Sequence, residues 1–242
     1  MCLMVALGLP ESSRARLAAK SGNVQAHPPR AVLKDYRAFL SDRLSLCYAL
    51  VIALTFGSHF SYVTGSLYVY VNVLHVSTVT YGALFGIMAL CLMLSSLLSG
   101  RLARHDLPGQ HIVGLALTVS VVSSLTTWAL ASTGHLNVIN LTALLSLNTI
   151  CLGLLTPCAQ QGAMERAGAY AGTASALMNA LTTGMGACAG YVEGLLLSRF
   201  HEVPGIVMSG QMAVCCGCAL LVFVFGSTRH GRADNCLAVP QD

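Results

Sequence analysis

Long runs of apolar residues without any charge dominate the chain. No Asp, Glu, Lys or Arg occurs between Arg43 and Arg101, or between Asp106 and Glu165. A helix needs about 20 mainly apolar residues to cross a bilayer, so runs of this kind are typical of transmembrane helices. The pattern predicts an all-α membrane protein with six transmembrane helices, at about residues 46–68, 81–100, 111–132, 138–158, 170–192 and 205–226.

The segments outside these spans are more polar or too short to cross a bilayer. Residues 1–9 are apolar but lack the basic flank of a secretory signal peptide. Residues 10–45 are interpreted as a cytosolic linker and residues 228–242 as a cytosolic tail. Within the linker, helical spacing around residues 31–40 predicts a short amphipathic helix with an apolar face made of Val32, Tyr36, Phe39 and Leu40.

The composition supports a membrane location. Hydrophobic residues make up 55% of the 242 positions and charged residues only 9%, whereas a soluble domain carries about a quarter charged residues. The chain therefore has too few charges to cover itself in water. This excludes a soluble enzyme, a disordered tail and a nucleic-acid binder.

The basic residues predict the orientation of the spans. If the linker is cytosolic, all of the 13 Lys and Arg residues except Arg199 fall on the cytosolic side, as the positive-inside bias requires. Both termini are then cytosolic. Four aromatic residues fall near the predicted outer ends of spans, where an aromatic belt is expected: Tyr68, Tyr70, Tyr81 and Trp128.

Small residues recur every four positions in the fifth span. They are Gly168, Gly172, Ala176, Ala180, Gly184 and Cys188, and a second series holds Gly186, Gly190 and Gly194. In lipid, a stripe of small residues lets two helix backbones approach closely. The pattern predicts a packing seam, and it leaves open whether that seam also moves.

Polar residues form stripes on three of the predicted spans. The stripes hold Thr55, His59, Tyr62 and Ser66 on the first, Thr142, Ser146 and Thr149 on the fourth, and Ser175, Asn179 and Thr182 on the fifth. Polar faces in membrane helices point toward other helices or a water-filled cavity. The stripes together favour a shared cavity, although for any single Ser or Thr a hydrogen bond to its own helix is the favoured explanation.

Two ionisable residues lie within or beside the spans, and the role of each has two possible interpretations. His59 lies near the middle of the first span, where it is either a functional group or a neutral histidine that bonds a neighbouring hydroxyl. Glu193 falls at the outer end of the fifth span, which favours an interfacial carboxylate over a buried proton carrier.

Signatures of other chemistries are missing or weak. The Cys215-Cys216-Gly217-Cys218 run has metal-site spacing, but it is embedded in apolar residues and favours packing. No carboxylate lies in mid-span, no Gly-x-Ser-Gly turn accompanies His59, and no phosphate-binding Gly-rich loop with Lys is present. We therefore expect no catalytic site, no metal and no cofactor. An intramembrane enzyme using His59 or the cysteine run is the weakest alternative.

Several segments resemble the Bcr/CflA-type drug/proton antiporters, the bicyclomycin and multidrug resistance carriers of the major facilitator superfamily. The run from Tyr81 to Gly86, followed by Gly100-Arg101-Leu102, is similar to the family's "YGLLF…G.L.GRL" segment. Pro157 with Ala171 to Leu177 resembles its "P…AGSASAL" run, and Phe60 to Ser66 its "F.YISGS" run. Leu9-Pro10-Glu11-Ser12 is similar to the family's "LPE(S/T)L" exit from helix six.

The resemblance maps the chain onto helices seven to twelve of this family. It implies half of a major-facilitator fold, a 3+3 inverted repeat, with residues 1–9 as the remnant of helix six. The implied function is efflux of drugs or other amphipathic small molecules in exchange for protons, in a bacterial inner membrane. His59, Tyr62, Ser66, Thr149, Asn179 and Thr182 would then bind the substrate. Arg101 and Arg104 would form a degenerate copy of the family's cytosolic loop motif.

The sequence departs from the family at several positions. Leu67 stands where the family usually has Pro, and Asn179 where it has Gly. The family's proton-coupling carboxylate belongs to the other half, so the implied partners are the lipid bilayer and a missing N-terminal six-helix half or a second copy. The rival interpretation is a non-transporting membrane subunit or a truncated remnant of such a carrier. An upstream reading frame that encodes six more spans would favour the split carrier.

The threading of the chain is tested with reporter fusions after Arg101 and after His135. We expect the two reporters to report opposite sides of the membrane, because one predicted span separates them. Enzymatic reporters that are active only in the cytosol or only outside it read this directly. Reporters in the same compartment would refute the six-span threading.

Overall fold

Six long helices form the structure, a computed structural model that describes residues 36, 37, 39–102, 109–164 and 171–237. The first helix, α4, is extended by a short π-helix, η1. The bounds are α4 Arg43–Tyr68, η1 Val69–Val73, α5 Thr78–Leu102, α6 Gly109–Ser132, α7 Val138–Met164, α8 Ala171–Arg199 and α9 Pro204–Leu237. A helix stands at each of the six segments predicted as spans, and the all-α membrane fold class is confirmed.

Five of the six helices are long and apolar enough to cross a membrane by length and composition, and α8 differs from them. The five candidate spans are Arg43–Val73, Thr78–Arg101, Gln110–Ser132, Val138–Met164 and Pro204–Gly226. Helix α8 has 29 residues but is rich in Gly, Ala and Thr, which makes it less apolar. The sixth span therefore stays a prediction that rests on the length of α8 and its place in the bundle.

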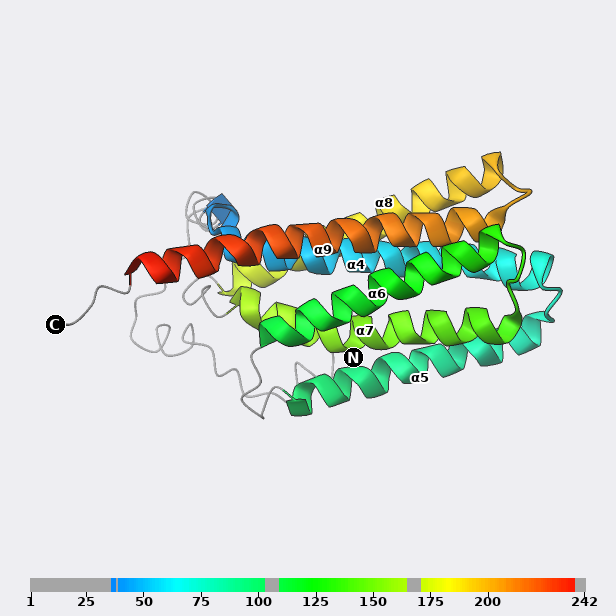
Figure 1. The fold of residues 1–242 in the computed structure, drawn as a ribbon, viewed down its shortest axis with the longest axis horizontal. Helices are drawn as coiled ribbons and strands as arrows, with labels where there is room; N and C mark the ends of the chain where they lie inside the picture. The colour runs from blue at the N-terminus through cyan, green and yellow to red at the C-terminus, as the bar shows by residue number, and fades with distance from the viewer. Residues whose placement is uncertain (1–35, 38, 103–108, 165–170, 238–242) are drawn as a thin grey trace, which may run out of the picture.

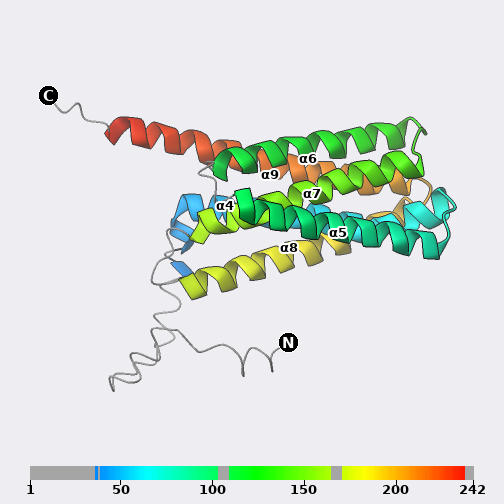
Figure 2. The same ribbon diagram turned by 90° about the horizontal axis from the view of Figure 1, so that it is seen from below.

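The helices run up and down in one bundle, with α4 and α7 at its centre. Helix α4 packs against α7, α8 and α9, while α7 packs against α4, α5 and α6. In Figure 1, α8 lies above this central pair and α5 below it, and the turned view of Figure 2 places α6 and α8 at opposite edges of the bundle. The turns at residues 74–77, 133–137 and 200–203 all lie at the same end of the bundle, as alternating helices require (Figure 1).

Left-handed residues end two of the helices at this end of the bundle. Gly134, with φ 72°, follows α6, and the His135 amide donates to the carbonyl of Leu130 at 3.1 Å. His75, with φ 53°, follows η1, and the Val76 amide donates to the carbonyl of Tyr70 at 2.9 Å. Both arrangements satisfy carbonyls that the last helical turn leaves without donors.

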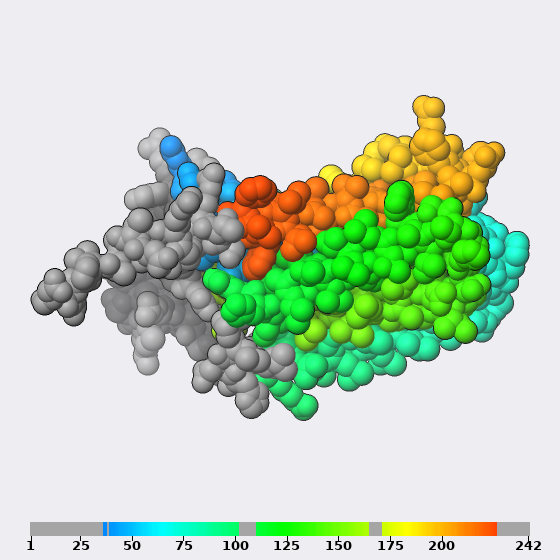
Figure 3. Space-filling model, viewed as in Figure 1, coloured from blue at the N-terminus to red at the C-terminus, as the bar shows by residue number. Residues whose placement is uncertain are grey.

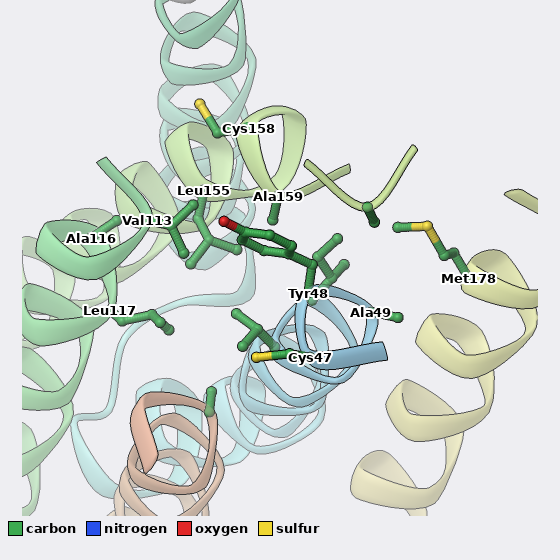
Figure 4. Close-up of a cluster of buried hydrophobic side chains, with 14 of the residues drawn as sticks. Cys47, Tyr48, Ala49, Val113, Ala116, Leu117, Leu155, Cys158, Ala159 and Met178 are labelled. Atoms are coloured by element: carbon green, nitrogen blue, oxygen red, sulfur yellow. The ribbon is translucent and has the colours of Figure 1, made fainter. Parts of the chain in front are cut away.

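The apolar core lies between the helices, and many large apolar side chains also face outward. Tyr48 of α4 points toward Val113 of α6 and Leu155 and Ala159 of α7 (Figure 4). Helices α6 and α9 cover much of the face shown in Figure 3. Leu115 of α6 is 69% exposed and Val214 of α9 is 65% exposed. A soluble monomer rarely exposes so much apolar surface, so these positions suit contact with lipid.

The predicted amphipathic linker helix is present in part. Residues 36, 37 and 39–41 are helical, and Val32 lies outside the described residues. Phe39 is 1% exposed and joins the core, whereas Leu40 is 50% exposed. Of the described residues of the predicted face, Phe39 is buried in the core, Tyr36 is partly buried and Leu40 is exposed, so this face is not buried as a whole.

The predicted aromatic belt also needs a correction at Tyr70. This residue is 0% exposed, and its hydroxyl hydrogen-bonds Thr142 Oγ1 of α7 at 2.7 Å. Trp128 is 44% exposed near the end of α6, as a belt residue would be. Tyr70 lies eight residues after Tyr62 and four after Ser66, so helical spacing places it on the same buried helix face as these two residues.

Buried polar side chains connect four helices. Asn148 of α7 donates to Ser124 Oγ of α6 at 3.0 Å and lies 3.4 Å from the carbonyl oxygen of Ser120. On the other side, the Cys216 thiol of α9 contacts Ser58 Oγ of α4 at 3.2 Å. Ser124 lies 3.8 Å from the Cys216 sulfur and joins the two pairs. Hydrogen bonds between helices of this kind help to hold membrane bundles together.

Glycine allows the closest approach between α5 and α7. A Cβ placed on Gly153 of α7 would lie 2.9 Å from the backbone carbonyl of Leu92 and would overlap Ser95 Oγ. Ser99 of α5 donates to the carbonyl of Leu154 at 2.8 Å one residue further along. Backbone atoms cannot move aside as a flexible side chain can, so this contact requires glycine.

We expect Gly153→Ala to destabilise the protein by about 1–3 kcal/mol, because the added methyl group forces α5 away from α7. The matched control is Gly184→Ala in α8, where a Cβ meets nothing within 4 Å. That substitution should be neutral or stabilise by up to about 1 kcal/mol through helix propensity. Thermal unfolding of both variants in lipid nanodiscs measures the difference, and equal midpoints would contradict the packing described here.

Candidate binding cavity

A cavity of about 350 Å³ lies between α4, α5 and α7. Its walls are mainly apolar, with one imidazole and two hydroxyl groups. The lining residues are Phe56, His59, Phe60, Val63, Leu92, Ser96, Leu152, Gly153 and Thr156. The volume falls at the lower end of the range typical of small-molecule sites.

The local sequence of α7 shapes one wall of this cavity. Gly153 contributes no side chain, and Pro157 follows it four residues later inside the helix. Proline has no backbone N–H, so the carbonyl of Gly153 loses the helical hydrogen bond that residue 157 would otherwise donate. The wall therefore offers a backbone acceptor beside the hydroxyl of Thr156, which itself donates to the carbonyl of Leu152 at 2.7 Å.

A row of aromatic rings runs along α4 and continues onto α5. The His59 ring centroid lies 6.4 Å from that of Phe56 and 5.3 Å from that of Tyr62. Tyr62 in turn stacks on Phe85 of α5, with ring centroids 6.1 Å apart. Rings in this arrangement present flat apolar faces, against which an aromatic or cationic ligand can stack.

Of the six residues predicted to bind substrate, the cavity lining contains His59 alone. Tyr62 is 3% exposed behind it, and its hydroxyl lies 2.8 Å from the Met88 sulfur. Ser66 is buried and pairs with the Tyr81 hydroxyl at 2.9 Å. These two side chains hold α4 against α5 and do not line the cavity.

The remaining three predicted residues also lie outside the cavity lining. Thr149 donates to the carbonyl of Leu145 at 2.8 Å, and Thr182 to that of Met178 at 2.7 Å. Asn179 is exposed on α8. Both threonine hydroxyls therefore bond their own helix, as the Thr156 hydroxyl also does. The polar groups of this cavity come from α4, α5 and α7, and none comes from α8.

The sequence reading missed most of the residues that do line the cavity. Phe56, Phe60 and Val63 flank His59 on α4, with Phe60 four residues and Val63 seven residues after Phe56, so they share its face. Taking this apolar spacing around the one intramembrane histidine as a site would have found them. No sequence pattern distinguished Ser96 or Thr156 as a site residue.

The two small-residue series of α8 differ in what they contact. Gly172, Ala176, Ala180, Gly184 and Cys188 are exposed within the described chain, and Gly168 lies outside it. Gly186 and Gly190 instead face α4, where an added Cβ would lie 2.9 Å from the Phe60 ring and 3.2 Å from Thr64 Oγ1. The second series thus contributes Gly186 and Gly190 to the seam between α8 and α4, whereas Gly194 is exposed.

The positions predicted for other roles are placed as follows. Arg101 is exposed in the last turn of α5, and Arg104 lies outside the described residues. Cys215, Cys216 and Cys218 are free thiols on α9 with different degrees of burial. They do not face a common point, which fits packing.

Glu193 differs from its prediction. The sequence favoured an interfacial carboxylate, but the side chain is 0% exposed, at the junction of α8 with α4 and α9. Neither carboxylate oxygen has a hydrogen-bond partner in the structure. The prediction of an interfacial carboxylate is therefore wrong, because the two neighbouring helices pack around this end of α8 and enclose the side chain.

Comparison with known proteins places these features in context. The sequence profile of the Major Facilitator Superfamily matches residues 1–191. The chain is 26% identical over 205 residues to the "Uncharacterized MFS-type transporter YdgK" of Bacillus subtilis (strain 168), an alignment that covers 84% of this chain. The alignment covers 48% of that relative, so the chain spans about half its length. No solved structure matches the chain.

Proposed function

Because the chain belongs to the major facilitator superfamily, we propose that it forms the C-terminal half of a drug/proton antiporter of the Bcr/CflA type. Membership of this family indicates membrane transport and points away from an enzyme. The proposal adds the direction of transport, efflux, and the class of substrate, amphipathic small molecules.

The observation that carries the proposal is the cavity between α4, α5 and α7. Its aromatic and aliphatic lining suits the apolar body of an amphipathic molecule, while His59, Ser96 and Thr156 offer hydrogen bonds to a polar group. Charged side chains are missing from this lining, which favours substrates held by stacking and shape. Breadth of substrate is expected of such a lining, because it contains few groups that demand a particular partner.

The proposed mechanism is alternating access around this cavity. Transporters with repeated halves rock one half against the other about a midplane site. The chain spans about half of its relative, so a second six-helix half or a second copy would complete the cavity. The exposed small residues Gly172, Ala176, Ala180 and Gly184 of α8 would let such a half approach closely.

The proposal includes location and energy source. A bacterial inner membrane with both termini in the cytosol follows from the basic residues and the resemblance. Energy comes from the proton gradient, with no bound cofactor. A non-transporting subunit or a remnant of such a carrier is the second candidate, favoured by the incomplete coverage of the relative.

Substrate binding is tested with a cavity-filling substitution. We expect Thr156→Phe to weaken binding of the lipophilic cation tetraphenylphosphonium to the purified chain at least about tenfold, about 1.4 kcal/mol, since the ring occupies the cavity. Thr118→Phe is the matched control. Thr118 is an exposed threonine of α6 that also bonds its own helix, at 2.8 Å from the Gly114 carbonyl. Equilibrium dialysis in nanodiscs gives both affinities, and equal loss in both variants would count against the cavity.

Transport by the chain alone is tested in vesicles. We expect liposomes that contain only this purified chain to show no dye extrusion when a pH gradient is applied, because one half cannot enclose the substrate. Fluorescence of an amphipathic dye follows the flux, with empty liposomes as the control. Extrusion that depends on the gradient would show that the chain is a complete transporter.

A further inference from the structure

Glu193 is enclosed by three helices and has no partner for its charge. Its Oε1 atom lies against Gly65 of α4, where an added Cβ would be only 2.9 Å from it and 2.9 Å from Met208 Cγ of α9. The space at this point is filled by the carboxyl group and the methionine, which explains why α4 carries glycine here. A small residue thus admits a carboxyl group into the helix interface.

Gln211 of α9 contacts α8 one helical turn before Glu193. Its Nε2 donates to the carbonyl of Ala189 at 2.7 Å. In an α-helix that carbonyl also accepts the backbone N–H of residue 193, so the amide meets α8 at the turn that carries Glu193. The Gln211 Oε1 atom has no hydrogen-bond partner.

The described part of the chain therefore gathers three buried oxygen atoms that lack donors. They are both carboxylate oxygens of Glu193 and Oε1 of Gln211. An unpaired carboxylate in an apolar interior costs several kcal/mol, about as much as folding contributes in total. One proton removes the charge and converts one carboxylate oxygen into an O–H donor. This donor can then pair with an acceptor that lacks a partner, such as Oε1 of Gln211.

The groups around Glu193 offer no other neutralisation. On α9 the nearest titratable group is the Cys215 thiol, which is not a cation. On α4, Gly65 and Thr64 face α8, while His59 lines the cavity and Tyr62 packs on Met88. Arg199, His201 and Glu202 are exposed at the turn between α8 and α9.

We propose that Glu193 is a proton-binding site, in which the neutral carboxylic acid donates a hydrogen bond to Oε1 of Gln211. The proton is transferred from hydronium in the aqueous phase: one O–H bond of hydronium breaks, a new O–H bond forms on one carboxylate oxygen, and water is released. A proton suits the site better than a metal cation, since a cation such as Na⁺ needs five or six oxygen ligands and the closely packed Gly65 and Met208 leave no room for them. The site is separate from the α4–α5–α7 cavity and does not depend on the proposed antiport.

Infrared spectroscopy of the purified chain in nanodiscs tests this proposal. We expect a carboxylic-acid carbonyl band at neutral pH, lost in Glu193→Gln and retained in Glu202→Gln, the matched control at an exposed glutamate. The band should also disappear from the wild-type chain at alkaline pH. Its absence at neutral pH, or its persistence in a folded Glu193→Gln variant, would overturn the proposal.

Two further measurements identify the hydrogen-bond partner of the Glu193 acid and the ion that the site binds. Gln211→Leu keeps the carboxyl group but removes its acceptor, so the band should remain and shift to higher frequency; an unshifted band would refute the pairing. Added NaCl at constant ionic strength should leave the band unchanged, whereas its loss on sodium addition would identify a sodium site instead. Neither measurement requires transport, so a failed antiport assay leaves the result intact.

Discussion

Close contact between helices at small residues is the constraint on which the rest of the structure depends. Lipid supplies no hydrophobic force between helices, so packing and hydrogen bonds must hold the bundle together. Helix α4 makes several such contacts, through Gly57 against Met185, Gly65 against Glu193 and Met208, and Cys47 against Gly226. Each contact brings α4 close to α8 or α9, and together they fix α4 in the centre of the molecule.

The central position of α4 determines where the cavity and the carboxyl group lie. One face of α4 carries Phe56, His59 and Val63 toward α5 and α7. Another face carries Gly65 against α8 and α9, with Glu193 between them. A single helix thus separates an apolar cavity from a buried acid.

The sequence predicted the positions of the helices, whereas five of the six residues predicted to bind substrate lie outside the lining of the described cavity. Charge-free apolar runs identify membrane helices, because a segment that crosses the hydrocarbon core must be about 20 residues long, apolar and hydrogen-bonded within itself. Side-chain orientation has no such signature. Thr149, Thr156 and Thr182 all bond their own helix, but of the three Thr156 alone lies in the cavity lining. Glu193 looked interfacial from its position, but burial depends on α4 and α9, which no local pattern describes.

Helix α8 packs against α4 with one face and leaves the other exposed, and the rest of the structure depends on this arrangement. It is less apolar than the other helices and carries both Glu193 and the small-residue series. Spin-label accessibility along α8, measured in nanodiscs in a cysteine-free background, tests this arrangement most directly. The account predicts that labels at Ala174 and Ala189, which are 0% and 6% exposed, are shielded from both oxygen and a water-soluble relaxant. Labels at the exposed positions Ala176 and Ala180 should be accessible to at least one of them. Uniform accessibility along α8, or the reverse pattern, would contradict the account.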